Sequence, residues 1–298
     1  MKHVIICSRG SDLALWQAHF VKSELERLGC SVELNIIKTK GDKIQNLSFD
    51  KLEGKGFFTK EIEDALLTKE IDLAVHSHKD LETNPPEGLI ISSVSDRANP
   101  ADILLINKNS IDNSQKWGLK KGAIVGTSSA RLKSQMLKYR SDVVINDLRG
   151  NVPTRINKLR QGDYNAILLA KAGVDRLEID LSEFVEIVLN PAEFVPAPAK
   201  GVLGLQIRES DQELNDILQK MNFPDVQKRI NLERNVLNLL DGGCQLPLGV
   251  YCNEMNELYV SYAETIDRPC HVLKYNVTDF ETQAREVIND LKQRSVLD

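Results

Sequence analysis

Apolar and polar positions follow two different periods along the first hundred residues. Strands are expected at residues 3–7, 31–39 and 71–77, and amphipathic helices at residues 13–29 and 60–70. Residues 41–56 show little periodicity and predict a loop. Alternation of strands with helices predicts an α/β fold in which parallel strands are covered by helices on both faces.

The same pattern returns in the next seventy residues. Strands are expected at residues 101–106, 123–126, 143–148 and 164–170, and helices at residues 127–140 and 151–163. Residues 61–77 and 154–170 both consist of a helical pattern, an acidic turn and an apolar strand. This similarity predicts two α/β domains with a cleft between them, at which strand ends and helix N-termini gather.

The last third of the chain differs. Residues 190–198 are rich in proline and predict a crossover segment. A long helical pattern at 226–243, further strands and a closing helix at 279–294 predict a small α+β domain. The expected domains are residues 1–98 with 197–214, residues 102–192 and residues 220–298.

Composition restricts the class of protein. Hydrophobic residues make up 42% and charged residues 27% of the 298 positions, as in a globular chain, and the net charge of -5 argues against a nucleic-acid binder. No window has the roughly 18 apolar residues of a membrane span. Five widely spaced cysteines without a CxxC pair argue against a disulfide framework or a structural zinc site. Without a secretory signal pattern, a cytoplasmic protein is expected.

Basic side chains recur where predicted strands end. Each of them lies at or just beyond the carboxyl end of a strand: Arg9, Lys79, Arg131, Arg149 and Arg155. That edge faces the ligand crevice in open α/β sheets, and guanidinium groups pair with carboxylates or phosphates. The positions therefore favour a ligand with several acidic groups, whereas ordinary surface arginines are the alternative for each one taken singly.

Two further features could carry chemistry. Asp80 follows Lys79 directly, so its carboxylate could stabilise positive charge or transfer a proton, although a helix cap is an equally simple role. His76 and His78 share one face, but without a third ligand at suitable spacing a structural role or solvent exposure is favoured over a metal site. Cys244 follows two glycines in DGGCQLPLG, where a thiol among cations could act as a nucleophile.

Several motifs, in this order, resemble the porphobilinogen deaminase (hydroxymethylbilane synthase) family along nearly the whole chain. They are LALWQAHFVK, GKGFFTKEIEDALL, DLAVHSHKDL, GTSSARL, LRGNVPTRINKL, AILLAKAGVDRL and GGCQLPLG. The resemblance implies an α/β fold of two domains like the lobes of a type II periplasmic binding protein around a cleft, plus a small C-terminal α+β domain. It also implies a dipyrromethane cofactor joined to Cys244 through a thioether.

The resemblance implies an activity as well. Such enzymes deaminate four porphobilinogen molecules and join them head to tail on the dipyrromethane primer, which releases hydroxymethylbilane and ammonia for heme biosynthesis. Asp80 would be the catalytic residue that assists loss of ammonia and stabilises the cationic pyrrole intermediates. Every ring carries an acetate and a propionate, which accounts for many arginines in an acidic protein.

The implied contacts fall into three groups. The substrate-binding residues are Arg9, Ser11, Arg149, Arg155 and Arg176. The cofactor-binding residues are Ser77, Lys79, Thr127, Ser128, Ser129, Arg131, Arg149, Asn151 and Arg155. Lys55 and Phe58 belong to a lid loop, and no metal is expected.

Three positions depart from the family pattern. Leu132 stands where the family has a second arginine, so one cofactor carboxylate would lose a partner unless Lys200 supplies the charge. Residues 197–201 read APAKG where the family has AVGQG, and His78 replaces an apolar residue beside Asp80. A monomeric enzyme acting on porphobilinogen, without nucleic acid or membrane, is the expected protein.

Two other classes remain open. A two-lobed carboxylate-binding or sensing protein would explain the cations but leaves the GGC turn unexplained. A phosphate-handling transferase would explain them too, yet neither GxxxxGK[ST] nor GxGxxG occurs.

Overall fold

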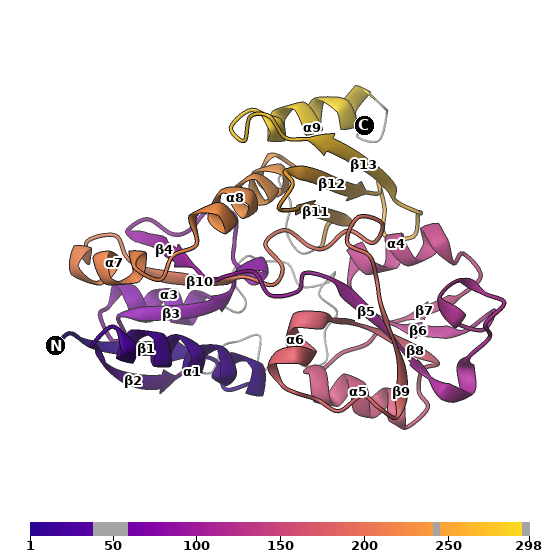
Figure 1. The fold of residues 1–298 in the computed structure, drawn as a ribbon, viewed down its shortest axis with the longest axis horizontal. Helices are drawn as coiled ribbons and strands as arrows, with labels where there is room; N and C mark the ends of the chain where they lie inside the picture. Colours follow the sequence, from indigo (N-terminus) through magenta and orange to yellow (C-terminus); the bar gives the residue numbers. More distant parts are fainter. Residues whose placement is uncertain (38–58, 241–244, 294–298) are drawn as a thin grey trace. The chain divides into compact units, whose positions relative to one another are not determined.

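A computed structural model describes residues 1–37, 59–240 and 245–293 (Figure 1). The helices are α1 (Asp12–Arg27), α3 (Lys60–Leu67), α4 (Ala130–Tyr139), α5 (Val152–Arg160), α6 (Lys171–Arg176), α7 (Gln212–Gln219), α8 (Pro224–Leu239) and α9 (Gln283–Gln293). The strands are β1 (His3–Ser8), β2 (Ser31–Ile36), β3 (Leu73–Ser77), β4 (Leu89–Val94), β5 (Asp102–Asn107), β6 (Ile124–Gly126), β7 (Val144–Asn146), β8 (Ala166–Ala170), β9 (Phe184–Val188), β10 (Leu203–Arg208), β11 (Leu248–Cys252), β12 (Glu257–Tyr262) and β13 (His271–Asn276).

The described residues divide into two compact units. Of these, the first unit comprises residues 1–37, 59–98 and 199–231, and the second comprises residues 99–198, 232–240 and 245–293. Between residues 59 and 293 the chain passes from one unit to the other three times, once within α8. The expected division into three domains stays a prediction.

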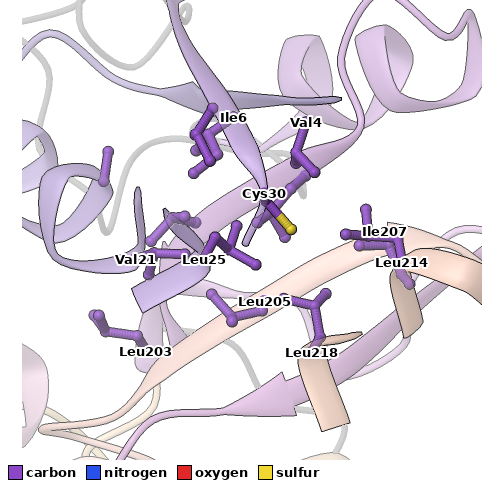
Figure 2. Packing of buried hydrophobic residues seen from close by; sticks show 14 residues of the cluster. Val4, Ile6, Val21, Leu25, Cys30, Leu203, Leu205, Ile207, Leu214 and Leu218 are labelled. Carbon is purple, nitrogen blue, oxygen red and sulfur yellow. The ribbon is translucent and has the colours of Figure 1, made fainter. Parts of the chain in front are cut away.

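The sheet of the first unit has the strand order β2-β1-β3-β10-β4. Alternate residues of β1 face opposite sides: Val4 and Ile6 pack in one apolar cluster, whereas Cys7 packs in another with α3. Figure 2 shows the first cluster, in which Val21 and Leu25 from α1 and Leu214 and Leu218 from α7 meet β1 and β10. Helices cover both faces, as the sequence predicts.

The sheet of the second unit has the corresponding order, β7-β6-β8-β5-β9. In both sheets three parallel strands stand in the order second, first, third, followed by two strands that pair antiparallel to their neighbours. Helix α4 contributes to the apolar cluster on one face, and α5 and α6 contribute to the cluster on the other. The expected similarity of residues 61–77 and 154–170 is confirmed, because α3 and β3 in the first sheet correspond to α5 and β8 in the second.

The expectation of parallel sheets is wrong for one strand in each unit. β10 runs antiparallel to β3 and β4, and β5 runs antiparallel to β8 and β9. Both strands enter their sheet directly after the chain has passed from the other unit, so no helical crossover within the sheet fixes their direction. The fold class, α/β with a small α+β part, is confirmed.

The remaining strands form an antiparallel sheet, β11-β12-β13, within the second unit. Residues from α8 and α9 complete its apolar cluster. The small α+β part expected near the C-terminus thus has its own sheet and core.

Residues 197–201 contain a departure from the family pattern, and the backbone explains part of its effect. Ala199 has φ +57° and is fully buried, in a left-handed conformation that glycine adopts at lower cost than alanine. Lys200 is buried in the first unit, and its carbonyl accepts a hydrogen bond from Arg97 Nε at 3.0 Å. Compensation of Leu132 by Lys200 stays a prediction.

Gly201 allows a close backbone approach in the first unit. Its φ is +91°, and a Cβ at this position would lie 2.4 Å from the carbonyl oxygen of Ala98. The backbone N–H of Ala98 also donates a hydrogen bond to Gly201 O at 3.1 Å. We expect Gly201→Ala to lower the free energy of unfolding by about 2–4 kcal/mol, because backbone strain and a clash add. Gly29→Ala is the control, since Gly29 has φ +87° with nothing within 4 Å. Urea unfolding should show a loss of only about 1–2 kcal/mol for that variant; equal losses would contradict the clash.

Candidate active site

The first unit gathers four candidate residues at one sheet edge. β1 and β3 are parallel neighbours, so their carboxyl ends lie at the same edge. Arg9 and Ser11 follow β1, and Lys79 and Asp80 lie in the short 3-10 turn His78–Asp80 after β3. Asp80 is exposed, while Arg9 and Lys79 are half-buried.

The serine hydroxyl groups at this edge form hydrogen bonds with other residues of the protein. The Ser11 side chain accepts the N–H of Ala14 at 3.4 Å and caps α1. Ser77 Oγ accepts a hydrogen bond from Gln17 Nε2 at 3.0 Å. Gln17 is buried on α1 and was missed by the sequence analysis, although a polar residue on the apolar face of a helix is a signal that could have found it.

Beneath this edge lies a buried polar chain. His76 Nε2 hydrogen-bonds Gln206 Oε1 at 2.9 Å, and Gln206 Nε2 donates to Glu63 Oε1 at 3.1 Å. All three residues are buried, so the structural role favoured for His76 is the one observed. His78 is also buried, with its ring beside Gly204.

Burial of the imidazole lowers the pKa of His76 to about 4, opposed by the hydrogen bond to Gln206 and the negative charge of Asp80. The Arg9 charge lowers the same pKa further, so both candidate residues act electrostatically on His76. Together these effects keep the ring neutral at pH 7.

The shift at His76 predicts a pH dependence of stability. The unfolded chain takes up a proton near the ordinary pKa of 6.5, whereas the folded protein does so only near 4. Stability is therefore lost as the pH falls from about 6.5 to 4, by about 3 kcal/mol in all. Urea unfolding of His76→Gln across this window should show a flatter pH dependence than wild type. Exposed His19→Gln is the control, and identical curves for His76→Gln and wild type would refute the assignment.

In the second unit, candidate residues lie at the corresponding edge. β6, β7 and β8 are parallel, and their carboxyl ends lead toward residues 127–129, residues 149–151 and α6, respectively. Arg176 ends α6, and burial lowers its pKa. A partly desolvated guanidinium at such an edge is suited to pair with a carboxylate.

Local hydrogen bonds shape these turns. Ser128 Oγ donates to Leu148 O at 3.1 Å and accepts from Leu148 N at 3.0 Å, which joins the turns after β6 and β7. Ser129 caps α4, and Thr127 Oγ1 accepts from Ser129 N at 3.2 Å. The cofactor contacts expected for these three residues stay predictions, because their hydroxyls already serve the backbone.

The next turn is organised in the same way. Asn151 Oδ1 accepts from Thr154 N at 3.0 Å and from Thr154 Oγ1 at 2.6 Å, and so caps α5. Arg155 Nε donates to Gly150 O at 2.8 Å. The turn therefore places the two half-buried guanidinium groups of Arg149 and Arg155 at one edge of the sheet.

Arg131 has a different environment from the one the resemblance implied. It is buried, with Nη1 at 2.8 Å from Asp102 Oδ2 and Nη2 at 3.2 Å from Asp102 Oδ1. A cofactor carboxylate would have to compete with this bidentate pair. Asp102 was also missed, although a charged residue at the start of the apolar run DILLI is a signal for a buried partner.

The departure at Leu132 has a structural explanation. Leu132 is buried in the apolar cluster that includes Leu104 and Met136. In this protein the position belongs to the core, so an arginine there would lose its hydration.

Some expectations fall outside the described residues. Cys244 and the lid residues Lys55 and Phe58 are among them. Within residues 1–37, 59–240 and 245–293, no three His, Cys, Asp or Glu side chains gather as a metal site. The described helices include none that is long and apolar enough to cross a membrane.

Comparison with known proteins decides the family. Residues 4–216 match the family model described as "Porphobilinogen deaminase, dipyromethane cofactor binding domain". The porphobilinogen deaminase of Chloroherpeton thalassium is 41% identical over 89% of this chain and 84% of its own length. That of Nitratidesulfovibrio vulgaris strain DP4 is 46% identical over 83% of this chain and 78% of its own. The chain belongs to the porphobilinogen deaminase family.

The resemblance seen in the sequence is thereby confirmed, and so is the expectation of an enzyme with a dipyrromethane cofactor. Among solved structures, the VFT2 domain of Bordetella pertussis BvgS aligns over 74% of this chain and 86% of its own at 14% identity, with a TM-score of 0.46. A likeness of that size adds nothing to the fold that the sheets already show.

Proposed function

We propose that this protein joins four porphobilinogen molecules head to tail on a dipyrromethane primer attached to Cys244, with loss of ammonia at each addition, and then releases hydroxymethylbilane from the primer by hydrolysis. The observation that supports this most directly is the position of Asp80. It stands beside Lys79 and close enough to Arg9 that both Arg9 and Asp80 influence His76, at the carboxyl edge of parallel strands.

The residues of the first unit would have different roles in the reaction. Asp80 would stabilise positive charge that develops as ammonia leaves, and Arg9 and Lys79 would bind carboxylates. Neutral His76 beneath them adds no competing charge. Ser11 and Ser77 would contribute mainly through the turns that they hold in place.

The second unit supplies cations for an acidic primer and its growing chain. When bound, the primer would supply the nucleophilic pyrrole carbon for the first addition, and the terminal ring of the growing chain would supply it for the later ones. Arg149, Arg155 and Arg176 would hold carboxylates, and the chemistry of these three groups fits a ligand with an acetate and a propionate on every ring. Arg131 is paired with Asp102 in the protein interior, so it would hold a cofactor carboxylate only in competition with that pair.

The intact mass of purified protein tests this function. Protein made in porphyrin-competent cells is expected to exceed the sequence mass by two linked pyrrole units, and Cys244→Ser is expected to lack that excess and all turnover. An unmodified wild-type mass would favour the alternative, a carboxylate-binding or sensing protein without turnover.

We further propose that the protein acts as a cytoplasmic monomer that uses neither nucleic acid nor membrane. The acidic net charge and the scattered cysteines support this view. Sedimentation of the primer-loaded protein at micromolar concentration would reveal any stable dimer.

A further inference from the structure

Both backbone polar groups of Val195, in the crossover segment 190–198, form hydrogen bonds with one glutamine side chain. Gln135 on α4 accepts the Val195 N–H at 2.5 Å through Oε1 and donates to Val195 O at 2.9 Å through Nε2. Both residues are fully buried. The amide of Gln135 therefore pairs with the backbone of Val195 as a neighbouring strand would.

A buried ion pair supports the same carbonyl. Arg131, one turn earlier on α4, donates from Nη1 to Val195 O at 2.9 Å. Its guanidinium is fixed by Asp102 at the start of β5. Val195 is thus tied to a helix and to a central strand of the second unit.

The crossover segment also contacts the sheet β11-β12-β13. Pro196 O accepts the N–H of Val250 in β11 at 2.9 Å. A Cβ on Gly249 would lie 2.5 Å from Val195 O and 2.5 Å from Ser261 Oγ, so only glycine permits this approach. Cys270 N also donates to Ser134 O at 3.2 Å, and α4 and β11 lie side by side (Figure 1).

One helix therefore connects the turn at residues 127–129 with β11. The first turn of α4 is capped by Ser129, next to the candidate contacts at 127–129. Further along, the helix holds β11, whose first residue, Leu248, follows Cys244 by four positions in the sequence. The spacing between β11 and the turn at the helix start is set through α4.

We propose that Gln135 is a positioning residue that fixes β11, the strand that follows Cys244 in the sequence, to α4, with Arg131, Asp102 and Gly249 completing the contact. The proposal rests on the proposed function. A strand held less firmly would present the attached primer in many orientations, and misplacement by about 1 Å can cost about 100-fold in rate.

The test uses the full chain prepared without primer and then supplied with porphobilinogen. The rate constant of primer loading is followed by intact mass, and amide exchange is measured for residues 248–252. Gln135→Met removes both hydrogen bonds at similar volume. Gln135→Glu keeps the acceptor for the Val195 N–H, so it replaces Gln135→Met in the test if that variant fails to fold. Gln283→Met is the control, because Gln283 is buried in α9 of the same unit and its side-chain amide donates to a local partner, Glu286, at 3.0 Å.

Under conditions where all variants are folded, we expect Gln135→Met to exchange at least tenfold faster in β11 and to load primer at least fivefold more slowly. Gln135→Glu should lie between it and wild type, and Gln283→Met should match wild type in both measurements. If wild type loads primer and the Gln135 variants match Gln283→Met in both measurements, the positioning role is overturned. A wild type that never gains the two pyrrole units would overturn the proposed function and this inference with it.

Discussion

Replacement of Asp102 by asparagine is expected to lower the free energy of unfolding by about 3–5 kcal/mol. Asp102 and Arg131 are both buried and are joined by two hydrogen bonds of 2.8 and 3.2 Å. Asparagine has the size of aspartate but no charge, so the guanidinium would remain buried without its counterion. Urea unfolding at pH 7 measures the loss.

A double-mutant cycle separates the ion pair from other effects of substitution. Arg131→Gln alone should also destabilise, whereas the double variant carries two neutral groups and should be more stable than the sum of the single losses predicts. We expect a coupling of at least about 2 kcal/mol. Losses that add to within about 0.5 kcal/mol would show that the pair contributes little, and Arg131 would again be available for a cofactor carboxylate.

Asp80→Asn is expected to reduce turnover by about 100- to 10,000-fold in protein whose mass shows the primer in place. The asparagine amide keeps the shape of the side chain but can neither stabilise a cation through charge nor transfer a proton. Because Asp80 is exposed, stability should change little. Steady-state assay of hydroxymethylbilane formation gives the ratio.

Asp64→Asn is the matched control, since Asp64 is an exposed aspartate on α3 of the same unit. It should retain wild-type turnover. If Asp80→Asn lost less than tenfold, the catalytic role would have to belong to another residue at that edge.

Much of the fold could be predicted because hydrophobic periodicity records burial directly. The apolar runs at β1, β3 and β8 are buried, and the helices that cover them repeat apolar positions at helical spacing. Strand direction could not be predicted, because periodicity contains no information on which neighbour a strand pairs with. β5 was therefore predicted as an ordinary strand and β10 was not predicted, and only the structure shows both to be antiparallel to their neighbours.

The candidate site was predictable to a similar extent. Strand ends indicated the edge at which Arg9, Asp80 and Arg149 lie, since the carboxyl ends of parallel strands meet. The partners of individual groups were not predictable, because Asp102 is distant from Arg131 in sequence and Gln17 from Ser77. Sequence alone could not distinguish a guanidinium neutralised inside the protein from one that faces a ligand.

The late position of β10 has a consequence for synthesis of the chain. β10 lies between β3 and β4, and Leu203 pairs with Ser77, so the first sheet stays incomplete until all of residues 99–198 have been translated. At about 5–20 residues per second, the interval from residue 77 to residue 203 lasts on the order of 10 s. During this time the growing chain exposes an apolar edge of β3 that can pair with other chains. The first unit therefore finishes folding late although it leaves the ribosome first, and its yield in the cell depends on how that edge is protected.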